Sequence, residues 1–357
     1  MSSPRGSGGR PTVTPDALPA RLTLDGRALV QNWRLLARLS GPAACGAAVK
    51  ADGYGLGARD VVARLAAAGC RDFFVATWGE AEALGQLPDG AVLSVLHGVR
   101  EADMALALAG PHRPVLNSAA QVARWKVAGG GACDVMVDTG MNRLGLTPEE
   151  AVSGLLDGLA IETLMSHLAC ADEPAHPLNA SQRAAFAALG ERVPARRTSL
   201  ANSAGIFLGA DYACDLTRPG LALYGGRPAP GAEGLAQVAR IEAQVLQVRT
   251  ADAGTPVGYG ATWTAERPTR IAVLNIGYAD GYLRGFSSRG HALAGGVRCP
   301  VAGRVSMDLL AVAVPDTVGE GDWLEIAYAL PEAAEQSGLS QYELLTGLGR
   351  RYGRRWS

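Results

Sequence analysis

Short runs of apolar residues alternate with longer amphipathic stretches of Ala and Leu between about residue 25 and residue 235. This alternation is typical of repeated strand–helix units around a parallel sheet. The candidate strands cover residues 45–50, 73–77, 92–96, 114–117, 134–138, 163–167, 198–202 and 215–218. Helical periodicity covers residues 58–68, 79–87, 101–108, 119–127, 148–156 and 179–189. The pattern predicts a (β/α)8 TIM barrel, with a doubly wound open sheet as the alternative.

After about residue 240 the pattern changes to runs of Val, Ile and Thr separated by turn residues, which predicts a mostly β domain. The candidate strands there cover 241–249, 270–276, 298–305, 309–314 and 322–327, and a closing helix is expected at 342–348. A stretch with many Gly and Pro residues at 225–234 marks the boundary. We therefore expect a flexible tail at 1–19, a barrel at 20–235 and a C-terminal β domain at 236–357.

Composition narrows the function classes. Hydrophobic residues make up 48% of the 357 residues and charged residues 19%, as in a globular protein with a large core. The formal net charge of -1 gives no basic field for nucleic acid or anionic membrane. The cysteines have no paired close spacing that would indicate zinc or a disulfide framework. Without a signal-peptide core or a membrane-length apolar run, we expect a cytoplasmic protein that acts on a small molecule.

Polar side chains stand where the predicted strands end, which is the face on which barrel enzymes build their sites. They are Lys50, Arg143, His167, Asn202, Ser203 and Arg218. Any one of them alone is more simply a solvated loop residue or a hydrogen-bonded core residue. Because they coincide on one face of a chain with few charges, we interpret them together as a site for chemistry.

Lys50 follows an apolar strand and precedes a turn with several glycines. Burial lowers the pKa of a lysine, and the resulting neutral amine is a nucleophile able to form an imine. A phosphate would find the hydroxyls of Tyr54 and Ser203 and the backbone N–H groups after Arg218. A reactive lysine, a phosphate cradle and a stacking histidine suggest pyridoxal phosphate as the cofactor. A barrel whose lysine forms imines with sugar phosphates is the alternative.

Motifs containing glycine and polar residues recur at 48–55, 138–145, 166–167 with 171–173, 202–203, 218–225, 258–263, 277–281 and 303–308. In these motifs and their order the chain resembles the alanine racemases, pyridoxal-phosphate enzymes of fold type III. The resemblance covers essentially the whole chain after the tail. It implies a barrel that binds the cofactor, followed by a β domain.

The resemblance implies catalysis by two bases. Lys50 would bind the cofactor covalently and act on D-alanine, and Tyr259 from a partner subunit would act on L-alanine from the opposite face. The cofactor would supply the electron sink. A homodimer with shared active sites follows, because each subunit contributes one base. The product D-alanine would supply bacterial peptidoglycan, with alanine catabolism as the alternative role.

The same resemblance implies roles for further residues. The cofactor would be held by Lys50, Tyr54, His167, Asn202, Ser203, Arg218, Gly220 and Leu221. Arg218 would hydrogen-bond the pyridine nitrogen, and His167 would orient it. The substrate carboxylate would be bound by Arg143 and by the loop of Met307 and Asp308. The narrow entrance would be lined by Asp172, Tyr278 and Arg304, and no metal is implied.

Two positions depart from the family pattern. Many relatives carry a lysine, often carbamylated, that positions the active-site arginine, and here Met136 stands in its place. Asn142, another side chain or a bound chloride would have to hold Arg143 instead. Some relatives place a tyrosine eight residues after the Tyr-Glu pair, which falls here on Arg350. The Arg-rich ending at 350–355 is expected to be a solvated tail, with an electrostatic contact as the alternative.

A racemase of broader specificity, acting also on serine, is the main alternative function, because the sequence does not set the substrate range. A pyridoxal-phosphate-binding homeostasis protein would share the barrel and its lysine but lack the β domain. Aldolases or dehydratases of this fold use a C-terminal His/Cys metal pair, and Cys299 has only His291 near it. Decarboxylases of this fold carry a catalytic cysteine in the neighbourhood where Ser306 stands.

Overall fold

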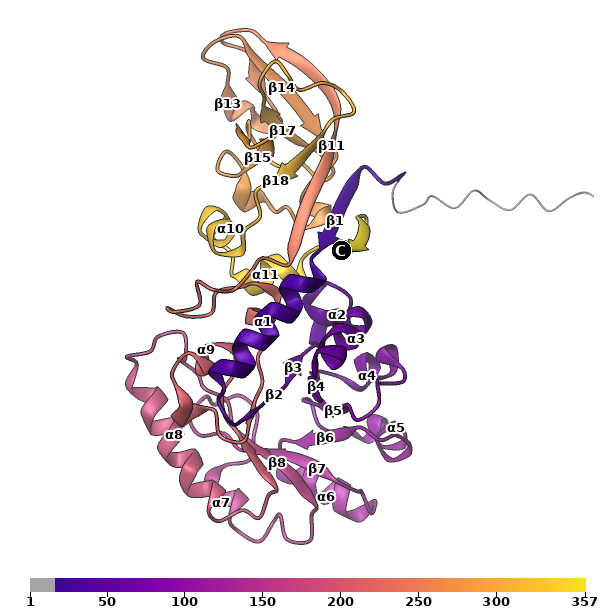
Figure 1. The fold of residues 1–357 in the computed structure, drawn as a ribbon, viewed down its shortest axis with the longest axis vertical. Coiled ribbons are helices and arrows are strands. Elements are labelled where there is room, and N and C mark those ends of the chain that lie inside the picture. Colours follow the sequence, from indigo (N-terminus) through magenta and orange to yellow (C-terminus); the bar gives the residue numbers. More distant parts are fainter. Residues whose placement is uncertain (1–16) are drawn as a thin grey trace, which may run out of the picture. The chain divides into compact units, whose positions relative to one another are not determined.

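The computed structural model describes residues 17–357, which form two compact units (Figure 1). The barrel unit consists of Asp25–Ala239 and Ser340–Thr346. The β unit consists of residues 17–24, Arg240–Leu339 and Gly347–Ser357. As far as residue 16, the tail expected at 1–19 lies outside the described residues.

Eight parallel strands close the barrel unit into a ring. Seven pair in chain order: β3 (Ala47–Ala48), β4 (Asp72–Val75), β5 (Val92–Val95), β6 (Arg113–Leu116), β7 (Cys133–Met136), β8 (Ile161–Met165) and β9 (Arg197–Ser199). The eighth, β10 (Leu216–Thr217), pairs with β2 (Ala44–Cys45), which continues into β3 across Gly46. Backbone hydrogen bonds from Asp215 to Thr198 and from Arg218 to Ala201 join β10 to β9. The predicted (β/α)8 barrel is confirmed.

The barrel unit also contains the helices that cover the outside of this sheet (Figure 1) and those at the carboxyl ends of its strands. They are α1 (Gly26–Leu39), α2 (Lys50–Tyr54), α3 (Ala58–Ala68), α4 (Trp78–Leu84), η2 (Glu101–Asp103), α5 (Met104–Ala109), α6 (Ala119–Val127), α7 (Pro148–Ala151), α8 (Pro177–Gly190), α9 (Ser203–Ile206), η3 (Ala210–Tyr212), η4 (Leu221–Tyr224) and α11 (Gln341–Thr346). The side chains of Asp25, Thr77, Ser118 and Thr147 cap the first turns of α1, α4, α6 and α7. Strands β4, β6 and β7 are buried along their whole length, because helices cover one face and the barrel core fills the other.

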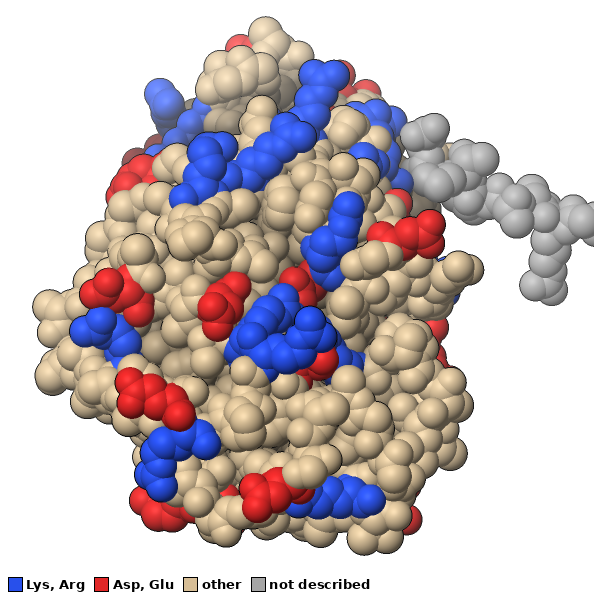
Figure 2. Space-filling view, turned by 60° about the horizontal axis from the view of Figure 1, so that its bottom comes forward, with Lys and Arg blue, Asp and Glu red and all other residues tan. Residues whose placement is uncertain are grey.

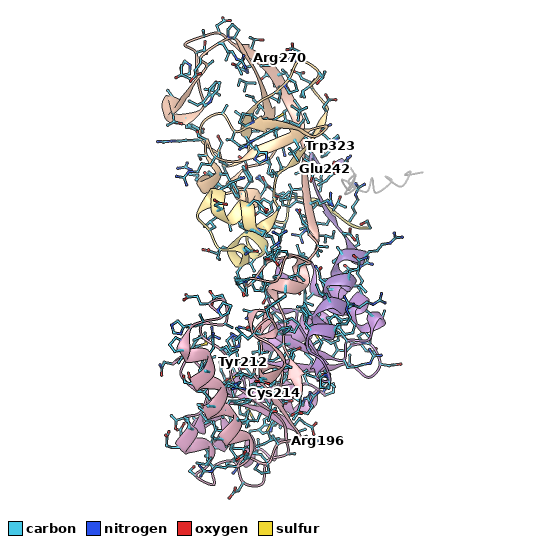
Figure 3. All side chains as sticks on the ribbon, turned by 60° about the vertical axis from the view of Figure 1, so that its left-hand side comes forward. Arg196, Tyr212, Cys214, Glu242, Arg270 and Trp323 are labelled. Carbon is cyan, nitrogen blue, oxygen red and sulfur yellow. The ribbon has the colours of Figure 1, made fainter. Side chains whose placement is uncertain are left out.

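Buried ions cluster at the amino-terminal ends of the barrel strands. Arg113 lies 3.9 Å from both Asp72 and Asp134, and 3.4 Å from Glu162. Burial raises the pKa of Asp134, while the nearby Arg113 acts to lower it. Glu162 also pairs at 3.4 Å with Arg196, which Figure 3 labels at this end of the barrel. This end of a barrel serves stability, whereas chemistry is built at the opposite end.

The β unit is built on an eight-stranded sheet. Its strands are β1 (Ala20–Leu24), β11 (Ala239–Ala251), β14 (Thr269–Leu274), β15 (His291–Ala294), β16 (Val297–Pro300), β17 (Leu310–Ala313), β18 (Trp323–Ile326) and β19 (Gly353–Trp356). The hairpin β12 (Pro256–Val257)–β13 (Trp263–Thr264), the helix α10 (Leu330–Ser337) and the turns η5 (Tyr259–Ala261), η6 (Tyr278–Asp280) and η7 (Arg284–Phe286) complete it. The long strand β11 pairs with β18 and β14, and Figure 3 labels Glu242, Trp323 and Arg270 on these three strands. The expected mostly β domain is confirmed.

The chain ends contradict one expectation. The Arg-rich ending is no solvated tail, because β19 pairs in parallel with β1 and Tyr352 is buried. The Tyr352 hydroxyl donates to the carbonyl of Asp280 at 2.8 Å, and Arg351 pairs with Asp280 at 2.7 Å and with Asp308 at 2.6 Å. The arginines of this segment led to the prediction of a solvated tail. Backbone pairing does not depend on side-chain charge, so an Arg-rich segment can still form a strand. The β unit therefore includes β1, and α11 belongs to the barrel unit although its flanking residues do not.

Charges are mixed on the surface. On the face shown in Figure 2, basic and acidic side chains stand in small groups among uncharged residues. This mixture agrees with the near-zero net charge of the chain. Among the described helices, none is long and apolar enough to cross a membrane.

Candidate active site

The carboxyl ends of the barrel strands surround a cavity of about 540 Å³, a size typical of small-molecule sites. It brings together every barrel residue that was expected to hold the cofactor or the substrate carboxylate. These residues are Lys50, Tyr54, Arg143, His167, Asn202, Ser203, Arg218, Gly220 and Leu221. The cavity lies wholly within the barrel unit.

Lys50 begins a turn with an uncommon backbone. Ala51, Asp52, Gly53 and Tyr54 all have positive φ angles, between 52° and 64°. Left-handed conformations cost non-glycine residues about 1–2 kcal/mol each and occur most often at functional sites. The Glu80 carboxylate braces the turn, because Oε1 accepts the N–H of Ala51 at 2.8 Å and Oε2 that of Ala76 at 2.7 Å.

The electrostatics of the cavity favour a neutral amine on Lys50. Burial is the main cause that lowers the pKa of Lys50, and the positive charges of Arg143 and Arg218 act in the same direction. Glu80 opposes the shift. A lowered pKa makes the amine available as a nucleophile and as a base.

Hydroxyl groups and backbone N–H groups gather at the η4 end of the cavity. The Ser203 hydroxyl accepts hydrogen bonds from the backbone N–H groups of Gly220 at 2.8 Å and Ala222 at 3.3 Å. The Tyr54 ring stacks on Tyr224, with centroids 4.7 Å apart. A Cβ on Gly220 would overlap the Tyr54 hydroxyl, so only glycine lets the backbone approach this closely. Backbone N–H groups and hydroxyls are the groups that bind phosphates in proteins.

A buried guanidinium and an imidazole lie beside this cradle. Arg218 donates to the Ser199 hydroxyl at 2.5 Å and to the Ser166 carbonyl at 2.6 Å, and its Nη2 lies 3.5 Å from Nδ1 of His167. Burial lowers the pKa of Arg218 to about 10, so it stays protonated at neutral pH. Burial first, and then the charge of Arg218, lower the pKa of His167 to about 3. The imidazole is therefore neutral, which lets it accept a hydrogen bond from Arg218.

The loop that carries Arg143 is folded around one carboxylate. Asp138 accepts the N–H groups of Gly140, Met141 and Arg143, each at 2.8 Å. Burial acts to raise the pKa of Asp138, but these backbone hydrogen bonds outweigh it and lower the pKa below its ordinary value. The side chain of Asn142, which was one candidate to hold Arg143, donates to the Gly140 carbonyl at 3.5 Å and is not among the residues that line the cavity.

Sequence reasoning missed several residues that line the cavity. His97, Asn117 and Tyr342 were not assigned to the site, and Met136 was noted only as a departure. Asn117 follows β6 as the other candidates follow their strands, so the rule that selected them applies to it as well. Tyr342 had no such signal, because α11 joins the barrel unit from a distant part of the sequence.

The remaining expected residues do not line the cavity. Asp172 is exposed in the barrel unit and is not among the residues that line the cavity. The others belong to neighbouring loops of the β unit: Tyr259, Tyr278, Arg304, Met307 and Asp308. The N–H of Tyr278 donates to the Ser306 carbonyl at 3.0 Å, and a Cβ on Gly260 would lie 3.2 Å from Nη1 of Arg304. Residues 17–357 contain no group of three His, Cys, Asp or Glu residues arranged to hold a metal.

Comparisons with known proteins point to one family over almost the whole chain. A family model described as the N-terminal domain of alanine racemase matches residues 24–228, and one described as its C-terminal domain matches 238–356. The chain is 47% identical to the alanine racemase of Rhodospirillum rubrum over 96% of both chains. It is 45% identical to a catabolic alanine racemase of Agrobacterium fabrum over 93% of this chain and 91% of that protein. The crystal structure of alanine racemase from Bartonella henselae with covalently bound pyridoxal phosphate covers 95% of this chain and 99% of its own, with TM-score 0.87 and 36% identity.

Proposed function

The chain belongs to the alanine racemase family and is a racemase that uses pyridoxal phosphate, and we propose that it interconverts L-alanine and D-alanine with two bases from two subunits. The observation that carries the proposal is the cavity in which Lys50, Arg218 and the Gly220 cradle converge. These groups supply an amine of lowered pKa, a buried guanidinium and donors for a phosphate. This set fits the cofactor.

The barrel residues have separate tasks in this proposal. Tyr54, Ser203 and the backbone of Gly220 and Leu221 bind the phosphate. Pyridoxal phosphate, when bound, takes up the electron pair left at the α-carbon. Arg218 donates to the pyridine nitrogen and keeps its own proton, because a guanidinium does not give it up at neutral pH.

Two proton carriers complete the reaction. The Lys50 amine removes or returns the α-proton of D-alanine, and the Tyr259 phenol does the same for L-alanine on the opposite face. Arg143 and the N–H of Met307 bind the carboxylate and so fix the α-carbon between the bases. The side chains of Tyr259 and Met307 are 69% and 53% exposed in the β unit, which supports a role in completing the site of a second subunit.

Incubation of the purified protein with pyridoxal phosphate and single L-amino acids tests the proposed reaction. We expect D-alanine as the main product by chiral chromatography, and a yellow protein that loses its colour in the Lys50→Ala variant. Comparable formation of D-serine would establish the broader-specificity alternative. Failure to form D-alanine would reject the proposal.

Mixing two inactive variants tests the shared site. Lys50→Ala and Tyr259→Phe are each expected to lose most activity, since each removes one base. If each site takes its two bases from different subunits, half of a mixed dimer's sites are intact, and random mixing restores about one quarter of wild-type activity. Mixed samples that stay inactive while forming dimers would show that both bases come from one chain.

We also propose that the product D-alanine supplies peptidoglycan synthesis. The catabolic name of the Agrobacterium fabrum relative keeps alanine degradation as the alternative. Deletion of the coding sequence distinguishes the two roles. A cell-wall role predicts growth that depends on added D-alanine, and a catabolic role predicts poor growth on alanine as carbon source.

A further inference from the structure

Asn117 has an amide whose orientation is fixed by its own neighbours. It follows β6, and its Nδ2 donates to the carbonyls of Leu96 at 2.9 Å and Val115 at 2.7 Å. Both amide hydrogens are therefore used. The reverse orientation would set Oδ1 against two carbonyl oxygens, which repel it. The Oδ1 atom is consequently an acceptor that needs a donor from elsewhere.

No donor reaches this atom among residues 17–357. Asn117 is 4% exposed, and its Oδ1 is buried without a hydrogen-bond partner. A buried carbonyl oxygen left unpaired destabilises the folded chain. Asn117 also lines the cavity, so a donor on another lining residue that turns toward the Asn117 amide would remove this destabilisation.

Arg143 lines the cavity with a guanidinium that has hydrogens to give. The Arg218 guanidinium already donates to Ser199, Ser166 and His167, and the proposed function assigns a further one of its hydrogens to the cofactor. Within residues 17–357, the Arg143 backbone is held by Asp138, but no hydrogen bond or ion pair holds its guanidinium.

The register of the strands places Asn117 beside the position that departs from the family. Leu116 on β6 is level with Val135 on β7, so the next pair along is Asn117 and Met136. Both line the cavity, as Arg143 does. The Met136 thioether is only a weak acceptor, whereas an amide oxygen is a strong one. Asn117 thus offers, on the neighbouring strand, an acceptor that Met136 lacks.

We propose that Asn117 is a positioning residue whose Oδ1 accepts a hydrogen bond from the Arg143 guanidinium and directs it at the substrate carboxylate. The inference rests on the proposed function, in which Arg143 binds that carboxylate. An amide is neutral, so it orients the guanidinium without cancelling the positive charge that the carboxylate needs. A hydrogen bond to a charged group contributes about 1.5–3 kcal/mol, which sets the size of the expected effect.

Binding of propionate, which is alanine without its amino group, tests this role in the cofactor-loaded protein. Asn117→Ala is expected to raise the propionate dissociation constant, measured by calorimetry, and the KM for alanine by about 10- to 100-fold. The cofactor absorbance and kcat should change much less. Asn117→Ser, which keeps a hydroxyl for one of the two carbonyls, serves if the alanine variant folds poorly.

Asn179 provides a matched control. It is also buried, donates to the carbonyls of Cys170 and Glu173 at 3.0 Å each, and leaves its Oδ1 unpaired, but it does not line the cavity. Asn179→Ala should lower the thermal midpoint about as much as Asn117→Ala, without changing the propionate dissociation constant. Equal weakening of propionate binding by both variants would mean that Asn117 acts only through stability.

A double-mutant cycle tests whether Arg143 is the partner of Asn117. In an Arg143→Ala background, Asn117→Ala should have no further effect on propionate binding, because the guanidinium that it orients is gone. Additive losses would overturn the inference. The proposed function is tested separately and fails if the wild-type protein makes no D-alanine. In that case the measurements of propionate binding still test the role of Asn117.

Discussion

Lys50 and Lys126 are the only lysines in the chain, and they have different surroundings. Lys50 lines the cavity with a pKa lowered mainly by burial, whereas Lys126 lies on α6 with its Nζ donating to the Leu155 carbonyl at 2.6 Å. Borohydride treatment of the protein with pyridoxal phosphate should therefore label the Lys50 peptide and leave Lys126 unlabelled. Mass spectrometry of tryptic or chymotryptic peptides measures this.

The control for that labelling is the Lys126→Arg variant, in which borohydride treatment should label Lys50 to the same extent as in the wild type. Lys50→Arg should abolish the label. Label on Lys126 at a comparable level would show that the cavity confers no special reactivity on Lys50.

His167 should make the apoprotein sensitive to acid. Its pKa is about 3 in the folded chain, against an ordinary value of 6.5, with burial as the main cause. Between these values the unfolded chain binds more protons, so stability rises with pH there and falls on acidification, by at most about 1.4 kcal/mol per pH unit. Urea unfolding at about pH 7 and about pH 5 should show a smaller loss for His167→Gln than for the wild type. The same loss in both proteins would contradict the buried, neutral imidazole.

At the scale of elements, α11 is the helix whose place in the fold is least expected from its position in the sequence. Its Tyr342 lines the cavity, with its ring centroid 6.3 Å from that of Tyr54. Burial, followed by the nearby Asp172, raises the pKa of the Tyr342 phenol. Because the two rings are neighbours, the Tyr342 ring supports the Tyr54 ring, and Tyr54 is expected to bind the phosphate.

Removal of this ring should loosen the cofactor. Tyr342→Ala is expected to raise the dissociation constant of pyridoxal phosphate by about 2- to 10-fold, the worth of one aromatic pair. Tyr342→Phe keeps the ring and should bind as the wild type does. Fluorescence titration of the apoprotein measures both. Equal weakening in the two variants would assign the effect to the hydroxyl instead.

The elements also show what sequence patterns can and cannot predict. The helices expected at 58–68 and 119–127 have those bounds in α3 and α6, because Gly69 ends one and Ser118 caps the other. The helix expected at 148–156 stops at Ala151, since Gly154 adopts a positive φ soon after. The predicted strands were found with shifts of a few residues. The helices α1 and α10, the hairpin β12–β13 and the strands β1, β15 and β19 were missed. For β1 and β19 the reason is that two strands that pair across most of the chain length give no local signal.

Some features of the site could likewise be predicted from the sequence, and others could not. The residues at strand ends could be selected from the sequence, since a barrel brings those ends to one face. The left-handed turn after Lys50 could not be predicted, because Ala51 disfavours positive φ and Asp52 adopts it only occasionally. The brace from Glu80 and the contact from Tyr342 depend on tertiary packing, which a single sequence does not encode in any local pattern.

At the scale of the whole molecule, stability and chemistry occupy opposite ends of the barrel. Arg113 is nearly buried between the carboxylates of Asp72, Asp134 and Glu162. Arg113→Ala should lower the free energy of unfolding by about 3–5 kcal/mol, because it leaves buried charges without their partner. The KM for alanine should stay unchanged. Denaturant unfolding and steady-state kinetics measure the two quantities.

Arg100 is the comparison for Arg113. It pairs with Asp103 at 2.7 Å, but its side chain is 78% exposed, so Arg100→Ala should leave the unfolding midpoint nearly unchanged. A midpoint equally unaffected by Arg113→Ala would show that water screens the buried cluster.

The pairing of β1 with β19 has a consequence for biosynthesis. The strand β1 ends at Leu24 and β19 begins only at Gly353, so during synthesis the edge of β1 that pairs with β19 has no backbone partner until more than three hundred further residues have been made. All the barrel strands have emerged more than a hundred residues earlier. A nascent chain should therefore acquire its barrel first. A premature stop codon just before residue 353 would release a protein with a bare strand edge, which invites aggregation.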